Sequence, residues 1–250
     1  MKVKHLVGAF LCVLGCYACS SPKTEVQSPD GHIKMTLTVD ENGKPFYNVS
    51  VDDSLLIENS AMGFTAANGI ILAEGFQVKN TTFSSEDETW TQPWGENKKN
   101  RNHYNEMAVS LTNEDQVQLT LRFRVFDDGI GFRYEYTVPT VDSLLITDEL
   151  TTFRFHRDGT SWSIPASAET YELLYQQQPI SEVETANTPF TFKTADGVYG
   201  SIHEAALYDF PEMTLKQIGH YTLKAELAPW PDGIKARKGN HFTTSWRTIQ

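Results

Sequence analysis

Apolar and polar residues alternate along most of the chain, and this period of two is typical of strands that bury one face. The strictest case runs from Val117 to Val125, where every second residue is apolar and the residues between them are glutamine, threonine or arginine. After Asp127-Asp128-Gly129 the alternation resumes at Ile130 and continues to Tyr136. Because aspartate and glycine favour tight turns, the two runs predict a β-hairpin.

Four more segments share this pattern, and they extend the prediction to the whole chain. They are Ile33 to Val39, Tyr47 to Val51, Phe190 to Ile202 around the turn Ala195-Asp196-Gly197, and Tyr221 to Leu227. Beyond the first 20 or so residues, no stretch keeps a helical period over three turns. We therefore predict an all-β protein, with one large domain of curved antiparallel sheets over residues 28–250.

Two long stretches interrupt the alternation. Ser84 to Glu106 is polar and aromatic at once, and Asp158 to Thr188 also mixes aromatic with polar residues. We predict a long loop at each place. Loops of this length are usually functional or held against a neighbouring domain.

The chain opens with the pattern of a secretory leader. Lys2 and Lys4 precede an unbroken apolar run from Leu6 to Leu14, which fits a signal peptide and is shorter than the ~20 residues of a membrane span. Small residues stand before Cys16 and before Cys19, as at the acylation site of bacterial lipoproteins. Either cysteine is a candidate for the lipid.

These features predict a lipoprotein signal peptide over residues 1–19 and a tether over residues 20–27. The protein is then exported to the periplasm or outer membrane, and it touches the membrane only through its lipid anchor. The alternative is a soluble periplasmic protein with incidental cysteines. No cysteine follows Cys19, so disulfides, thiolate metal sites and cysteine nucleophiles are excluded from the folded part.

Charge narrows the choice of partners. The formal net charge is −11, and such a surface repels phosphate backbones, so nucleic acid is not an expected partner. Neutral substrates or cations suit it better.

Two tryptophans offer a platform for a sugar. An indole ring can stack on the apolar face of a pyranose while polar neighbours bind its hydroxyls. Trp90 and Trp94 stand four residues apart, and Arg101, His103 and Tyr104 follow closely. Two alternatives remain. Either these residues form an interface with a neighbouring domain, or both tryptophans belong to the core.

His203 and Glu204 begin like a zinc-protease helix, but the residue four places after His203 is Leu207, so the second histidine ligand is absent. From the residues alone they are a polar pair at a strand end.

Several segments together resemble one known family, the N-terminal domain of glycoside hydrolase family 97. They cover the chain from about Ser28 to its last residue. The segments are Asp87 to Trp90, Trp94 to Glu96, Arg101 to Glu106, Phe123 to Tyr134, Ser201 to Leu207, Leu227 to Gly233 and Ser245 to Gln250.

The resemblance implies a β-super-sandwich of the galactose-mutarotase type, which in family members precedes a catalytic (β/α)8 barrel. Those members are exported bacterial α-glucosidases and α-galactosidases with an active-site calcium ion. Their acid and their base or nucleophile lie on the barrel. Their N-terminal domain gives one glutamate to the calcium, and the motif assigns that role to Glu204.

We therefore predict a module that buttresses a catalytic barrel, helps it act on α-linked oligosaccharides and donates a calcium ligand. As a truncated or split chain it would be inactive alone and hold calcium weakly, so its standing as an enzyme is open. Glu204 is expected at a strand end with its carboxylate facing outward. Two alternatives stay open. One is a stand-alone carbohydrate-binding lipoprotein that uses Trp90 or Trp94, and the other is a complete enzyme with two buried carboxylates in one cleft.

Overall fold

The structure is a computed structural model that describes residues 24–67, 69–167 and 169–250. The predictions on the leader, on Cys16 and on Cys19 lie outside these residues. Within them the only helical segment is a short 3-10 turn, Ile180–Glu182. No helix in the described ranges is long and apolar enough to cross a membrane.

Four antiparallel sheets make up the described chain. The first sheet has the order β1 (Glu25–Gln27), β2 (Ile33–Val39), β3 (Pro45–Val51), β4 (Ser54–Ala61). The largest sheet has the order β14 (Gln176–Pro179), β13 (Gly159–Ser163), β16 (Phe190–Thr194), β17 (Tyr199–Ala205), β22 (Trp246–Ile249), β10 (Gly129–Thr137), β9 (Gln118–Phe126), β8 (Lys99–Thr112), β7 (Gln77–Thr91), with β21 (His241–Thr243) also paired to β10.

The two smaller sheets lie beside this pair. One has the order β20 (Ala236–Gly239), β11 (Ser143–Glu149), β5 (Phe64–Ala66), β6 (Ile71–Leu72), and the other has the order β12 (Thr152–Arg154), β19 (Thr222–Leu227), β18 (Met213–Gly219), β15 (Thr185–Ala186). The predicted all-β antiparallel sandwich is confirmed.

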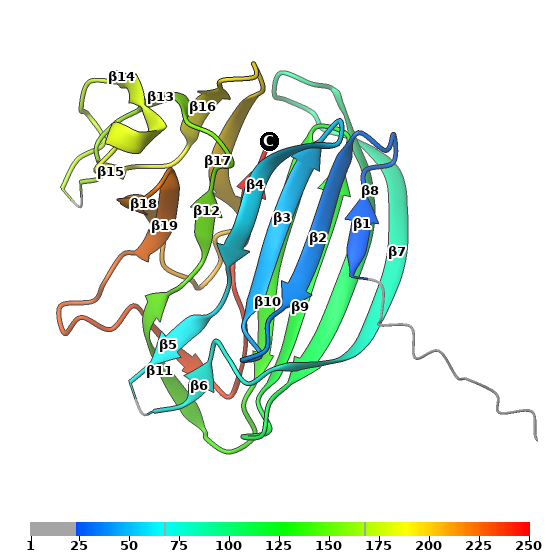
Figure 1. Ribbon diagram of the computed structural model, residues 1–250, viewed down its shortest axis with the longest axis vertical. Helices are drawn as coiled ribbons and strands as arrows, with labels where there is room; N and C mark the ends of the chain where they lie inside the picture. The colour runs from blue at the N-terminus through cyan, green and yellow to red at the C-terminus, as the bar shows by residue number, and fades with distance from the viewer. Residues whose placement is uncertain (1–23, 68, 168) are drawn as a thin grey trace, which may run out of the picture.

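The core lies between the first sheet and the long strands of the largest one. Figure 1 shows β1 to β4 stacked in front of β8, β9 and β10. Phe132 of β10 packs against Tyr47 of β3, with 4.9 Å between ring centroids, and against Phe153 of β12 at 6.5 Å. All three side chains are fully buried, so they join three sheets into one apolar core.

The clearest predicted hairpin is confirmed. In β9 and β10, Phe126 pairs with Gly129, so Asp127 and Asp128 alone form the connection. The residues predicted to face the core, such as Phe123, are buried, and the arginines between them face the other side.

The prediction of a long loop from Ser84 to Glu106 is wrong, because this stretch is mostly a long hairpin formed by β7 and β8. β7 is the edge strand, and nearly all of its residues are exposed on both faces. A strand with solvent on both sides has no apolar face to encode, so the period of two is lost from its sequence.

The second predicted loop is partly correct. Residues 158–188 contain the short strands β13, β14 and β15, and the irregular stretch between β13 and β14 exposes Tyr171, Leu174 and Tyr175.

Candidate functional site

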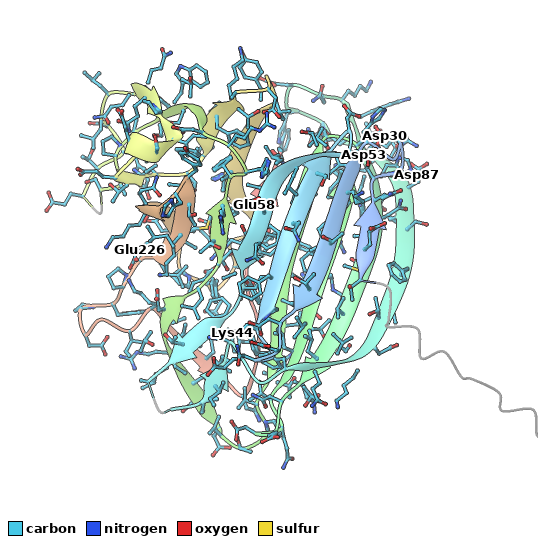
Figure 2. All side chains as sticks on the ribbon, viewed as in Figure 1. Asp30, Lys44, Asp53, Glu58, Asp87 and Glu226 are labelled. Atoms are coloured by element: carbon cyan, nitrogen blue, oxygen red, sulfur yellow. The ribbon has the colours of Figure 1, made fainter. Side chains whose placement is uncertain are left out.

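The end of the β7–β8 hairpin carries both candidate tryptophans on the surface. Trp90 is 49% exposed near the end of β7, and Trp94, in the turn, is 82% exposed. Arg101 of β8 donates two hydrogen bonds to Asp87 of β7, at 2.7 and 2.8 Å. This fork beside Asp87 holds the pKa of that carboxyl below its ordinary value. In Figure 2, Asp87 and Asp30 lie at the same end of the molecule.

His103 and Tyr104 belong to the packing of this end. Tyr104 is 8% exposed, and the Arg124 guanidinium lies 4.4 Å from its ring centroid, so its ring has no open face for a sugar. Nδ1 of His103 is buried and lies 3.6 Å from a carboxylate oxygen of Asp127. Tyr104 is therefore packed beneath the surface at this end of the hairpin, whereas Trp90 and Trp94 are exposed on that surface.

A cleft lies beside the hairpin on the outer face of the largest sheet. Arg124 and Arg133 both lie over the ring of Trp246, at 4.8 and 4.7 Å from its centroid. These groups come from three neighbouring strands, β9, β10 and β22. The lining includes Trp90, Arg101, Asn102, Arg124, Asp128, Ala205, Trp246, Thr248 and Gln250. This mixture of aromatic, charged and amide groups can bind a polar, hydroxyl-rich molecule.

The predicted outward orientation of the Glu204 carboxylate is wrong. Glu204 is the penultimate residue of β17, as expected, but its side chain is only 6% exposed. It points to the same side of the strand as buried Ile202, two residues earlier, whereas His203 and Ala205 are exposed. The period of two that places Ile202 in the core therefore also turns Glu204 inward.

Glu204 belongs to a buried group of three charges, which we call the triad: Glu149, Glu204 and Arg247. Arg247 of β22 lies directly opposite Glu204 in the sheet and donates to its Oε2 at 2.6 Å. The same guanidinium donates to both oxygens of Glu149, at 3.0 and 2.5 Å. The Glu149 and Arg247 side chains are at most 1% exposed. The triad therefore joins the largest sheet to β11.

The second carboxylate oxygen of Glu204 is also held. Its Oε1 accepts a hydrogen bond from the backbone N–H of Met213, at 3.0 Å. Burial raises the pKa of Glu204, and it outweighs the lowering by Arg247 and by this N–H. The carboxylate is thus fixed in position by two elements, β22 and the start of β18.

A hollow of about 290 Å³ opens beside Glu204, and its lining includes Tyr171, Asn187, His203, Ala205 and Glu212. Glu212 accepts a hydrogen bond from the Tyr171 hydroxyl at 2.5 Å. Asn187 is 3% exposed, and both polar atoms of its amide lack a hydrogen-bond partner among the described residues. A buried amide without a partner is costly, so the hollow is suited to a further polar group.

The residues present fit one part of a calcium site and not a whole one. Among the described residues, no three acidic, histidine or cysteine side chains come together in a way that could hold a metal ion. Calcium takes about 6–8 oxygen ligands, so Glu204 could contribute only with ligands from elsewhere.

The hairpin cleft and the Glu204 hollow are neighbours. Ala205, at the end of β17, lines both of them. The tertiary structure thus brings together two sets of candidate residues about 100 positions apart in the chain.

Sequence reasoning did not identify Glu149, Asn187 or Arg247 as members of a site. A signal existed for Arg247, because it alternates with Ile249 toward the core. No comparable signal marks Glu149, since a bulge between Ile146 and Asp148 changes the alternation just before it.

Comparison with known proteins shows what the chain is similar to. Residues 26–250 match the family described as Glycosyl-hydrolase 97 N-terminal. A retaining alpha-galactosidase of Bacteroides thetaiotaomicron is 25% identical over an alignment of 246 positions, which covers 92% of this chain and 36% of that protein.

Solved structures of related enzymes also match most of the chain. A glycoside hydrolase family 97 enzyme from Pseudoalteromonas sp. strain K8, in complex with acarbose, is 38% identical with a TM-score of 0.87, over 90% of this chain and 35% of that one. A beta-arabinopyranosidase shares the fold at 21% identity, with a TM-score of 0.82, over 90% of this chain and 39% of that one. The chain therefore spans about a third of the length of these relatives.

Proposed function

The chain belongs to the glycosyl-hydrolase 97 N-terminal family, and on this premise we propose that it supports the catalytic barrel of an α-glycosidase and donates Glu204 to a shared calcium ion. The observation that carries the proposal is the family match over residues 26–250, set against relatives about three times as long. The substrate class is α-linked glucosides or galactosides. It is supported by the relatives, one of which is an alpha-galactosidase and another of which binds acarbose.

Glu204 would hold the calcium from the side of this domain. A hollow of about 290 Å³ lies beside it, and carboxylates and waters of the barrel would complete the shell of oxygens there. When bound, calcium supplies a fixed positive charge that can orient the substrate and polarise its oxygens. Without the barrel, Glu204 would bind calcium weakly.

Export and lipid anchoring at Cys16 or Cys19 are part of the proposal and are supported by the leader alone. Metabolic labelling with palmitate, compared between the wild type and Cys19→Ser, would identify the acylated cysteine.

The purified chain is expected to show no glycosidase activity. Cleavage of a glycoside needs an acid and a base or nucleophile at a set separation, and in this proposal both come from the barrel. The measurement is release of p-nitrophenol from the α-glucoside and the α-galactoside in calcium. The same chain fused ahead of the barrel of the Pseudoalteromonas relative provides the positive control.

Turnover by the chain alone would contradict the proposal and favour an enzyme complete within it. Glu204 and Glu212 would then be the first residues to test, because both line the same hollow. Activity that survives in Glu204→Gln and in Glu212→Gln would point to a contaminant.

The exposed tryptophans favour a second function, binding of α-linked oligosaccharide by the domain itself. On this proposal panose binds beside the hairpin, and Trp94→Ala weakens its binding about tenfold, the loss of roughly 1.4 kcal/mol of stacking. Isothermal titration calorimetry measures the dissociation constant. Trp230→Ala is the matched control, since Trp230 is 59% exposed and lines a different depression. An equal effect of both substitutions, or no saturable binding, would exclude a sugar platform at the hairpin.

A further inference from the structure

The triad raises a question about Glu204 as a cation ligand. A carboxylate that is paired with a buried guanidinium has its charge largely neutralised, and a neutralised carboxylate attracts calcium poorly. Glu204 accepts a hydrogen bond from Arg247 at 2.6 Å, and Arg247 is fully buried. If Glu204 and Arg247 formed an isolated pair, Arg247 would therefore weaken the binding of a cation by Glu204.

The contacts of Glu149 with Arg247 reduce this neutralisation of Glu204. It accepts two hydrogen bonds from Arg247, one from Nε and one from Nη2, whereas Glu204 accepts one from Nη1. The two-point contact is the stronger arrangement for a guanidinium and a carboxylate. Arg247 is therefore held first by Glu149, and Glu204 receives only its remaining N–H.

The charges in the triad do not cancel. Two carboxylates share one guanidinium, so one negative charge is left over in a place that water hardly reaches. Ser245, which accepts a hydrogen bond from Nη1 of Arg247, adds no charge. Of the two carboxylates, Glu204 is the one that lines the hollow, so the excess charge is available there.

We propose that Glu149 is a positioning residue that takes up most of the charge of Arg247 through its two-point contact, and so leaves the triad with a net negative charge for a cation beside Glu204. Glu149 does not line the hollow and would not touch the cation itself. It acts through Arg247, which also holds the Glu204 carboxylate in place. This inference rests on the proposed calcium role of Glu204 and adds a second residue on which that role depends.

The test measures calcium affinity in the chain fused ahead of the barrel of the Pseudoalteromonas relative, by isothermal titration calorimetry. Glu149→Gln removes the charge of Glu149 and lets Arg247 neutralise Glu204. It is expected to weaken calcium binding about tenfold or more, as is usual for a residue that orients a metal ligand. Glu58→Gln is the matched control, because Glu58 also pairs with an arginine but does not line the hollow. Its calcium affinity should equal that of the wild type.

A double variant separates charge from folding. In Glu149→Gln with Arg247→Gln, both partners become neutral, and the single negative charge of Glu204 returns. Its calcium affinity should recover toward the wild-type value, a result that a merely structural role for Glu149 does not predict. Circular dichroism tests whether each variant is folded. If Glu149→Gln is unfolded, the calcium affinity of the double variant still tests the inference.

The outcomes distinguish this inference from the proposed function. If Glu204→Gln weakens calcium binding but folded Glu149→Gln does not, Glu149 has no such role and the proposed function stands. A folded double variant that fails to recover affinity would also overturn the inference. If the wild-type fusion binds no calcium, or Glu204→Gln leaves its affinity unchanged, the proposed role of Glu204 fails and the inference fails with it.

Discussion

Arg247→Met is expected to lower the free energy of unfolding by about 3–5 kcal/mol, because it leaves two buried carboxylates without their shared partner. Methionine has a similar length and fills much of the same space, so the loss comes mainly from charge. The Arg247 side chain is 1% exposed, and those of Glu149 and Glu204 are 0% and 6% exposed. Solvent therefore cannot replace the missing guanidinium. Urea denaturation of the chain, followed by tryptophan fluorescence, measures the change.

Arg154→Met is the matched control for Arg247→Met. Arg154 also pairs with a glutamate, Glu58, at 3.2 Å, but its side chain is 43% exposed. Water can solvate both partners there, so the control should cost less than about 1 kcal/mol. Similar losses at the two positions would show that the triad is not the strongly coupled group described above.

Phe132→Ala is expected to destabilise the chain by about 3–5 kcal/mol as well, because it opens a cavity where the sheets meet. Phe132 is fully buried, and its ring lies within 6.5 Å of the rings of Tyr47, Phe123, Tyr134 and Phe153, measured between centroids. These partners come from β3, β9, β10 and β12, which cannot all move inward to fill the space. The same urea experiment measures the loss.

Phe83→Ala provides the comparison for Phe132→Ala, since it is the same substitution on edge strand β7, where Phe83 is 51% exposed. Removing an exposed ring leaves no cavity, so the change should stay within about 0.5 kcal/mol. If Phe132→Ala also costs less than 1 kcal/mol, the core does not pass through this ring.

The stability variants and the calcium-binding variant test different parts of the proposal. Arg247→Met and Phe132→Ala test whether the domain is held together as described, whereas Glu149→Gln tests whether a buried charge serves a ligand. A large stability loss in Arg247→Met, with a folded Glu149→Gln whose fusion to the barrel binds calcium poorly, would separate stabilisation from function within the triad.

The sequence by itself determined the class of fold and the buried face of most strands. Val117 to Val125 shows this, because alternation is a property of neighbouring residues and needs no knowledge of the partner strand. The same rule, applied to the end of β17, turns Glu204 toward the side of Ile202, so its burial could have been predicted. The long hairpin escaped prediction because its exposed edge strand has no apolar face to encode.

Only the tertiary structure decided which groups meet. Glu204 and Arg247 are 43 residues apart and become neighbours because β17 and β22 pair in the largest sheet. Glu149 faces the core because a bulge between Ile146 and Asp148 reverses the side to which the following residues point. A bulge and a strand order depend on the packing of distant segments, and that packing has no counterpart in local alternation. For this reason the sequence predicted a sandwich and a candidate glutamate, whereas the contacts of the buried triad that hold this glutamate depend on the tertiary structure.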